Sequence, residues 1–389
     1  MDYGFDLVTP RRGTGAYKWD AVPPAGQAED IIPLWVADMD FPAAPCIREA
    51  LRKRVEHGIF GYTHIPDSYY RAVIRWFGER HGWHIEKDWI QYTSGVIPAL
   101  SAVIKALTVP GDKVILQTPV YNCFFSSIRN NGCEIADSPL RCREGRWGFD
   151  YDSLERLCGD PAARILLLCN PHNPAGRVWT PEELRRVGTI ARRHGIIVVS
   201  DEIHCEIVMP GFRYTPYASL PGNQEGSITL CSPSKSFNIA GLQIANIVTD
   251  NPEWRRKIDR AININEVCDV NPFGPVALEA AYSDEGAAWL EALNNYIREN
   301  YRYLQDTLEG GFPIAPLEGT YLAWVDVRKL GMASEKIEES LLEHEHVWVN
   351  AGSLYGTEGY IRINLACPRA TLEAGLNRLN QGLEKLQNL

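Results

Sequence analysis

Short apolar runs alternate with amphipathic stretches along the middle of the chain. The runs have the length of buried strands and cover residues 113–117, 164–169, 196–200, 228–231 and 244–249. Stretches with helical spacing separate the first three runs, at residues 121–130 and 181–194. This alternation predicts an α/β fold in which helices cover both faces of a mainly parallel sheet.

The two ends of the chain have a different pattern. Residues 1–42 carry many Gly and Pro and no periodicity, so we expect an extended arm there. Between this arm and the alternating part we expect helices at residues 43–57 and 67–81, a strand at 89–93 and a helix that ends near Leu107. After Asn251 the chain turns helical, and beyond Gly310 strands and helices alternate more loosely: a long helix at 287–308, strands at 321–327, 347–350 and 360–365, and helices at 334–344 and 369–386.

These patterns predict three parts. Residues 1–42 form an N-terminal arm that contributes to the small domain, residues 43–286 form a large domain, and residues 287–389 form a small α+β domain.

Composition narrows the class of protein. The 389 residues are 45% hydrophobic and carry a net charge of -10, which disfavours nucleic acid and anionic membrane surfaces as partners. The ten cysteines, Cys268 among them, form no C-x-x-C pair, so we expect reduced thiols and a cytoplasmic protein. No segment has the apolar length of a membrane span, and the N-terminus lacks the pattern of a secretory signal.

Lys235 is the first candidate for chemistry. It lies in the sequence SPSKSFNIAG at residues 232–241, directly after an apolar run. A desolvated lysine loses proton affinity and becomes a nucleophilic amine, which Schiff-base chemistry requires. The alternative, an ordinary lysine in a serine-rich turn, is equally open on this stretch alone.

Other polar residues follow the predicted strands, where ligands bind in open α/β sheets. Residues 94–96 (SGV) open a helix whose free N–H groups suit a phosphate. Residues 170–176 (NPHNPAG) form either a rigid loop that aims a donor or a simple turn. Asp201 and Glu202 enter an apolar core, which is costly unless a cation, such as a protonated ring nitrogen, pairs with one of them. The histidine pairs of residues 81–84 and 344–346 lack the rest of a metal coordination set.

The order of these motifs resembles one superfamily across nearly the whole chain. SGV, Tyr121, NPHNPAG, DEIH at 201–204, SPSK and an arginine in YIRIN at 360–364 are similar to the fold-type I aminotransferases, which depend on pyridoxal 5'-phosphate. The sequences WVADMDFP at 35–42 and GIFGYT at 58–63 look like the cystathionine β-lyase (carbon-sulfur lyase) branch.

The resemblance implies a role for each matching residue. Lys235 would attach the cofactor and then remove the substrate's Cα proton, with Tyr121 near the reacting atoms and stacked on the cofactor ring. The remaining cofactor contacts would be Asp201 at the pyridine nitrogen, Asn173 and His204 at the phenolic oxygen, and Gly95, Val96, Ser232, Ser234 and the partner subunit's Tyr62 at the phosphate. Arg362 would hold the substrate carboxylate, with Ala37, Tyr121 and Asn173 beside it. The resemblance further implies a homodimer with active sites at the subunit interface.

One position departs from the superfamily. Many members have an arginine or lysine eight residues after the lysine, whereas this chain has Gln243. We therefore expect the phosphate to rely more on hydroxyl and backbone N–H donors.

The activity that the resemblance implies is β-elimination from L-cystathionine or a related cysteine S-conjugate, giving a thiol, pyruvate and ammonia. Homocysteine is the thiol released from cystathionine. An amino-acid aminotransferase would use the same lysine and remains an alternative. A second alternative is a regulator that binds a transcription factor, because proteins resembling this branch can act so.

Overall fold

The structure, a computed structural model, describes residues 2–21, 30–266 and 270–388. Its centre is a seven-stranded sheet in the order β2-β10-β9-β8-β7-β3-β4. The strands are β2 (Ile90–Thr93), β3 (Lys113–Leu116), β4 (Glu134–Asp137), β7 (Ala163–Cys169), β8 (Ile197–Asp201), β9 (Ser227–Cys231) and β10 (Ala245–Val248). Strand β10 runs antiparallel to the other six strands, which are parallel to one another. The predicted mainly parallel sheet is therefore confirmed.

Both faces of this sheet are buried because its strands are apolar at successive positions. On one face Leu166 and Leu168 of β7 lie in a hydrophobic core with Leu184. On the other face Ile165 and Leu167 share a core with Leu100, Phe124 and Ile258, which come from three different helices. Successive side chains of a strand point to opposite faces, so a continuous apolar run is what a two-sided core requires.

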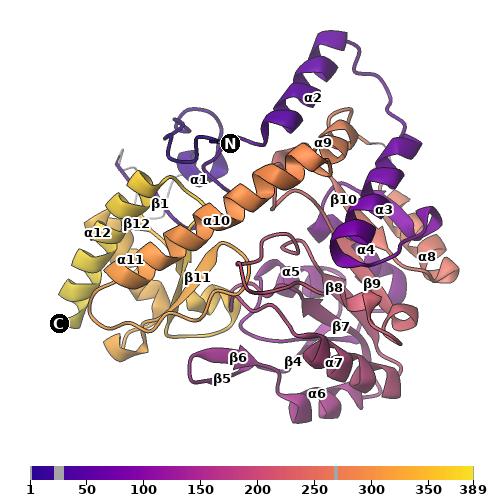
Figure 1. Ribbon diagram of the computed structural model, residues 1–389. Helices are drawn as coiled ribbons and strands as arrows, with labels where there is room; N and C mark the ends of the chain where they lie inside the picture. Colours follow the sequence, from indigo (N-terminus) through magenta and orange to yellow (C-terminus); the bar gives the residue numbers. More distant parts are fainter. Residues whose placement is uncertain (1, 22–29, 267–269, 389) are drawn as a thin grey trace.

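The helices lie on both sides of the sheet (Figure 1). Their bounds are α1 (Tyr17–Asp20), α2 (Pro45–His57), α3 (Asp67–His81), α4 (Val96–Leu107), α5 (Cys123–Asn130), α6 (Tyr151–Cys158), α7 (Pro181–Arg193), α8 (Pro252–Asn263), α9 (Gly274–Ala281), α10 (Asp284–Thr307), α11 (Ser334–Glu345) and α12 (Arg369–Gln387). Local sequence sets several helix starts: Thr180 and Glu183 form a capping box at α7, and the side chain of Asn251 caps α8. No helix of the described ranges has the length and hydropathy needed to cross a membrane.

A second, smaller sheet is built from the C-terminal part. Strands β11 (Leu322–Asp326), β14 (Tyr360–Asn364) and β13 (Asn350–Ala351) pair antiparallel in that order. The N-terminal arm joins this part, because β1 (Ile32–Pro33) pairs with β12 (Val347–Trp348). Helix α10 runs diagonally beside the small sheet in Figure 1. The domain bounds at residues 42 and 286 remain predictions.

Some local structure differs from the sequence expectation. The strand expected at 347–350 is two short strands, β12 and β13. The expected extended arm contains the single turn of α1. Strand β4, helix α6 and the hairpin of β5 (Arg141–Arg143) and β6 (Arg146–Gly148) were not predicted from the sequence. Strand β4 lies at the sheet edge, where Glu134 and Asp137 face solvent, so its sequence lacks the apolar run of a buried strand.

Candidate active site

A cavity of about 200 Å³ opens where β2, β7, β8 and β9 end. It brings together nine of the predicted site residues: Ala37, Gly95, Val96, Tyr121, Asn173, Asp201, His204, Ser234 and Lys235. Its wall also contains Ser94, from the SGV sequence that was expected to suit a phosphate, and residues that were not predicted, namely Ile97, Pro98, Cys169, Ile203, Ala240 and Ile244. The polar residues therefore gather at the strand ends, as expected for an open α/β sheet.

Lys235 reaches into this cavity from the loop after β9. Its Nζ donates a 2.6 Å hydrogen bond to the backbone oxygen of Ala37. Burial lowers the pKa of Lys235, and the opposite charge of Asp38 offsets part of this effect. The amine is therefore easier to deprotonate than an exposed lysine, as a nucleophile or general base requires.

Asp201 ends β8 and is buried at the bottom of the cavity. Its Oδ1 accepts a 3.1 Å hydrogen bond from the backbone nitrogen of Ile203. Burial raises the pKa of Asp201 from 3.8 to about 7, since no described residue forms an ion pair with it. A bound cation would stabilise the buried carboxylate in this position.

The next residue, Glu202, is buried in a different way. Its carboxylate accepts hydrogen bonds from Ser200 at 2.8 Å, the Tyr217 backbone at 2.9 Å, Asn170 at 3.2 Å and the hydroxyl of Tyr214. These contacts occupy the carboxylate within the protein. Glu202 therefore orders the segment after β8, whereas Asp201 remains available to a ligand.

His204 lies in the cavity wall beside Asp201. Burial, together with the charges of Lys235 and Arg362, lowers the pKa of its ring to about 3. The ring is therefore neutral, and its Nδ1 is buried without a hydrogen-bond partner among the described residues. Its ring centroid lies 5.8 Å from that of Tyr321. A neutral imidazole with one free nitrogen can donate to, or accept from, a bound group.

Arg362 projects from β14 beside the cavity, although it does not line it. One guanidinium nitrogen donates to Asn173 Oδ1 at 3.3 Å and the other to the backbone oxygen of Trp35 at 2.7 Å. Its Nε is buried without a partner, and no carboxylate of the described residues forms an ion pair with it. A buried guanidinium held only by neutral oxygens is suited to a bidentate contact with a ligand carboxylate.

Tyr121 lines the cavity between these charged groups. Burial raises the pKa of its hydroxyl well above the usual value, with Cys123 adding to the effect and Arg362 opposing it. The hydroxyl is therefore protonated and can donate a hydrogen bond within the cavity.

Two candidates for the phosphate site, Ser232 and Tyr62, lie outside the cavity wall. Ser232 donates its hydroxyl to the Ile244 backbone at 2.5 Å and accepts from the Ser234 backbone at 3.0 Å, so it braces the lysine loop. Tyr62 is 97% exposed. The contacts of these two residues with a phosphate remain predictions, while Ser94, Gly95, Val96 and Ser234 do line the cavity. Gln243, the position where many members of the superfamily have a cation, is exposed and also outside the wall.

Residues 29–379 match the model of the family "Aminotransferase class I and II". The chain belongs to this family. It is 38% identical to a cystathionine beta-lyase, PatB, of Bacillus subtilis, over 97% of this chain and 99% of that protein. Two solved structures have a TM-score of 0.94 to this chain: a PLP-bound putative aminotransferase from Clostridium difficile, at 39% identity over 98% and 100% of the two chains, and cystalysin from Treponema denticola, which contains pyridoxal 5'-phosphate, at 34% identity over 99% and 100%.

Two further residues of this aminotransferase-family chain were missed at the sequence level. The hydroxyl of Tyr321 donates a 2.9 Å hydrogen bond to the same Ala37 oxygen that Lys235 contacts. The backbone oxygen of Trp35 holds Arg362. Trp35 opens the WVADMDFP sequence, but its contact is made by a backbone oxygen, which carries no sequence signal, and Tyr321 lies in none of the motifs.

The cysteines of the described ranges are free thiols, and two histidines outside the cavity contact carboxylates of the protein. Nine of the cysteines lie in the described ranges and all nine are free, whereas Cys268 lies outside the described residues. The ring of His81 contacts the buried carboxylate of Glu206 at 2.6 Å, and that of His346 contacts Asp30 at 2.7 Å. Within the described residues, no three potential ligands are grouped to hold a metal ion.

Proposed function

We propose that this chain is a pyridoxal-phosphate-dependent carbon-sulfur β-lyase. Its substrate would be L-cystathionine or a related sulfur-containing cysteine S-conjugate, and its products a thiol, pyruvate and ammonia. The observation that carries the proposal is the convergence of an amine, a carboxylate and a guanidinium, those of Lys235, Asp201 and Arg362, none of which has an ion-pair partner among the described residues. The 38% identity of this chain to the cystathionine beta-lyase PatB supports the choice of reaction.

The residues of the cavity fit pyridoxal phosphate group by group. Asp201, a buried carboxylate without a cation, would pair with the protonated pyridine nitrogen. Asn173 and the unpartnered nitrogen of His204 would hold the phenolic oxygen. The N-terminus of α4, with Ser94 and Ser234, would bind the phosphate. When bound, the cofactor supplies an electron sink for the charge that develops at the substrate's Cα.

The protein's own groups would orient the substrate and move its proton. Arg362 would bind the α-carboxylate bidentately, which replaces its contacts with the Trp35 and Asn173 oxygens. Ala37 and Tyr121 would contact the substrate beside this carboxylate. The Lys235 amine, with its lowered pKa, would take the proton from Cα and hold it at Nζ. The Tyr121 hydroxyl would donate a hydrogen bond near the reacting atoms.

We also propose the assembly and the location that the sequence predicts. Tyr62 is almost fully exposed on the segment between α2 and α3, which is consistent with insertion into the active site of a second copy. A homodimer would then complete the phosphate site, to which Ser232 would contribute. The nine free cysteines of the described ranges agree with a cytoplasmic location.

The test is incubation of the purified protein with pyridoxal phosphate and L-cystathionine, without any keto acid. We expect pyruvate and homocysteine in equal amounts over many turnovers. L-Alanine is the matched control, because it has the same carboxylate and amine but no leaving group on Cβ, and it should give at most one equivalent of pyruvate per subunit, the yield of a single half-transamination. A reaction that stops after one turnover, with the cofactor left in its amine form, would show an aminotransferase instead.

A further inference from the structure

Residues 36–41 do not pair as a strand, Ala37 among them lines the cavity, and the side chains of two asparagines hold their backbone. Asn364 Nδ2 donates to the oxygens of Val36 and Asp38 at 2.5 and 2.6 Å. Asn238 donates to the oxygens of Met39 and Phe41 at 2.9 and 2.8 Å. Asn238 follows Lys235 by three residues and Asn364 follows Arg362 by two. The segment is therefore fixed to both functional elements.

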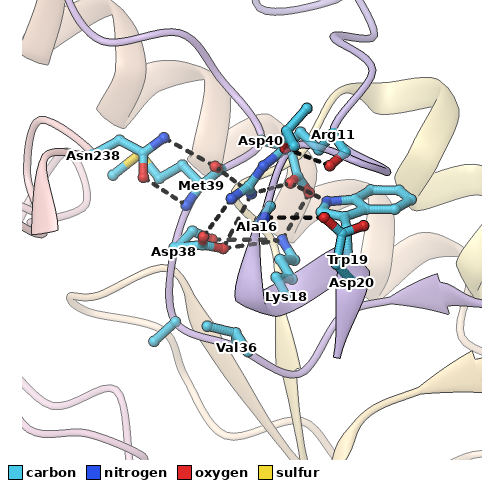
Figure 2. A network of polar contacts seen from close by, with 12 residues as sticks. Arg11, Ala16, Lys18, Trp19, Asp20, Val36, Asp38, Met39, Asp40 and Asn238 are labelled. Atoms are coloured by element: carbon cyan, nitrogen blue, oxygen red, sulfur yellow. Dashed lines mark hydrogen bonds and ion pairs between the residues drawn. The ribbon is translucent and has the colours of Figure 1, made fainter. Parts of the chain in front are cut away.

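Ion pairs fix the same segment on its other side (Figure 2). Arg11 contacts Asp38 and Asp40, each at 2.7 Å, and Lys18 contacts Asp40 at 2.7 Å. Lys18 and Asp40 are buried. Figure 2 also shows the Asn238 side chain directed at the Met39 backbone, so the arm, the lysine loop and the segment form one connected network.

The oxygen of Ala37, the second residue of this segment, has two donors. Lys235 Nζ donates to it at 2.6 Å and the hydroxyl of Tyr321 donates at 2.9 Å. Two positions earlier, the Trp35 oxygen holds Arg362 at 2.7 Å. The contact with Lys235 is made by the free amine, which is the state in which this lysine can accept a proton.

We propose that Tyr321 is a positioning residue for the Lys235 amine, and that residues 36–41 set the spacing between this amine and Arg362. Tyr321 holds the Ala37 oxygen in place, so this oxygen orients Nζ while the amine is free. A substrate carboxylate on Arg362 displaces the Trp35 oxygen, and the two asparagines keep the rest of the segment in place. The kinetic consequence of this inference rests on the proposed function. The position of the amine rests on the geometry alone.

The test compares Tyr321→Phe with Tyr301→Phe in the full-length protein. Tyr301 is a matched control because its buried hydroxyl also donates to a backbone oxygen, that of Ala315 at 3.1 Å, away from the cavity. In the cofactor-free protein, acetylation of Lys235 by acetic anhydride, followed by peptide mass spectrometry, should be about three- to tenfold faster in Tyr321→Phe, the range that one neutral hydrogen bond represents. Tyr301→Phe should match the wild type.

With cofactor and cystathionine, Tyr321→Phe should lower kcat about tenfold, because it impairs a positioned base without removing it, and should change KM less than twofold. Equal labelling and kcat in Tyr321→Phe and wild type, or equal changes in Tyr301→Phe, would overturn the proposal. If Tyr321→Phe fails to fold, Asn364→Ser decides, since it loosens the same segment and should also speed the labelling. The labelling result stands even if the wild type releases no pyruvate, so failure of the proposed function and of this inference are distinguishable.

Discussion

Asp201 and Glu206 are buried carboxylates of one segment, and their surroundings differ. Glu206 is contacted by the ring of His81 at 2.6 Å, by Trp76 Nε1 at 2.8 Å and by Arg80 at 3.2 Å. Burial alone would raise the pKa of Glu206, but His81 and Arg80 outweigh it, so the pKa lies below the usual 4.5. The Asp201 carboxylate has only the Ile203 backbone as a donor among the described residues, and its pKa rises to about 7.

The difference separates a structural site from a binding site. Every oxygen of Glu206 has a donor on α3, so the carboxylate ties this helix to the segment after β8. Around Asp201, the charges of Lys235 and Arg362 also lack ion-pair partners within the described ranges. Buried charges without partners cost free energy of folding, so their grouping in and beside one cavity indicates that a ligand supplies the missing charges.

The largest expected effect is at the cavity. Lys235→Ala removes the amine, and we expect the steady-state rate of pyruvate release to fall more than about 10³-fold, within the range of a lost acid-base group. The visible absorption band of the bound cofactor should change with it. Lys87→Ala, which alters an exposed lysine paired with Asp67, is the control. Pyruvate release at the wild-type rate in Lys235→Ala would contradict the assignment.

The next largest effect is expected on stability, at the structural carboxylate of Glu206. Glu206→Gln should lower the free energy of unfolding by about 3 kcal/mol at neutral pH, since it leaves Arg80 and His81 beside a neutral group. The depressed pKa of Glu206 contributes stability above pH 4.5 that is lost as the pH falls through its folded-state value. Denaturant unfolding at several pH values measures this difference, which should shrink toward low pH. The exposed Glu225→Gln should have no effect, and a deficit independent of pH would refute the ionic role.

Asp201→Asn should change the free energy of unfolding in the opposite direction and stabilise the cofactor-free protein. In the cofactor-free protein, the raised pKa of Asp201 keeps the folded state protonated while the unfolded state ionises, so wild-type stability falls as the pH rises from about 4 to about 7. Relative to the wild type, the variant should therefore gain about 2 kcal/mol across this range, less than the full shift because water can enter the cavity. Added pyridoxal phosphate should stabilise the wild type more than the variant. A constant difference from pH 4 to 8 would rule out the raised pKa.

The sequence predicted the cavity better than the structural carboxylate, for a physical reason. Lys235, Asp201 and Asn173 each follow an apolar strand, and parallel strands bring their carboxyl ends to one edge. Their order along the chain then carried the resemblance. Helix α3 was predicted at its observed bounds from its amphipathic spacing, and in the structure it ends at Gly82, which has a positive φ.

The contacts that could not be predicted join distant residues without a repeating pattern. Glu206 meets Trp76 across 130 positions, and Tyr321 meets Ala37 across 284. Such pairs depend on how the helices and the arm pack against the sheet, which periodicity does not encode. The hairpin of β5 and β6 was missed because its strands have only three residues each and are mostly polar.

The smallest expected effect concerns the guanidinium of Arg362, which has no ion-pair partner among the described residues. Arg362→Lys keeps the positive charge but loses the two-pronged geometry and the unpartnered Nε, so KM for cystathionine should rise about tenfold with a smaller change in kcat. Steady-state kinetics measure both constants, with the exposed Arg185→Lys as control. Because the Trp35 oxygen would still find a donor in the new lysine, the fold should keep its stability. If kcat falls while KM stays constant, Arg362 acts on the reaction step and does not serve as the carboxylate site.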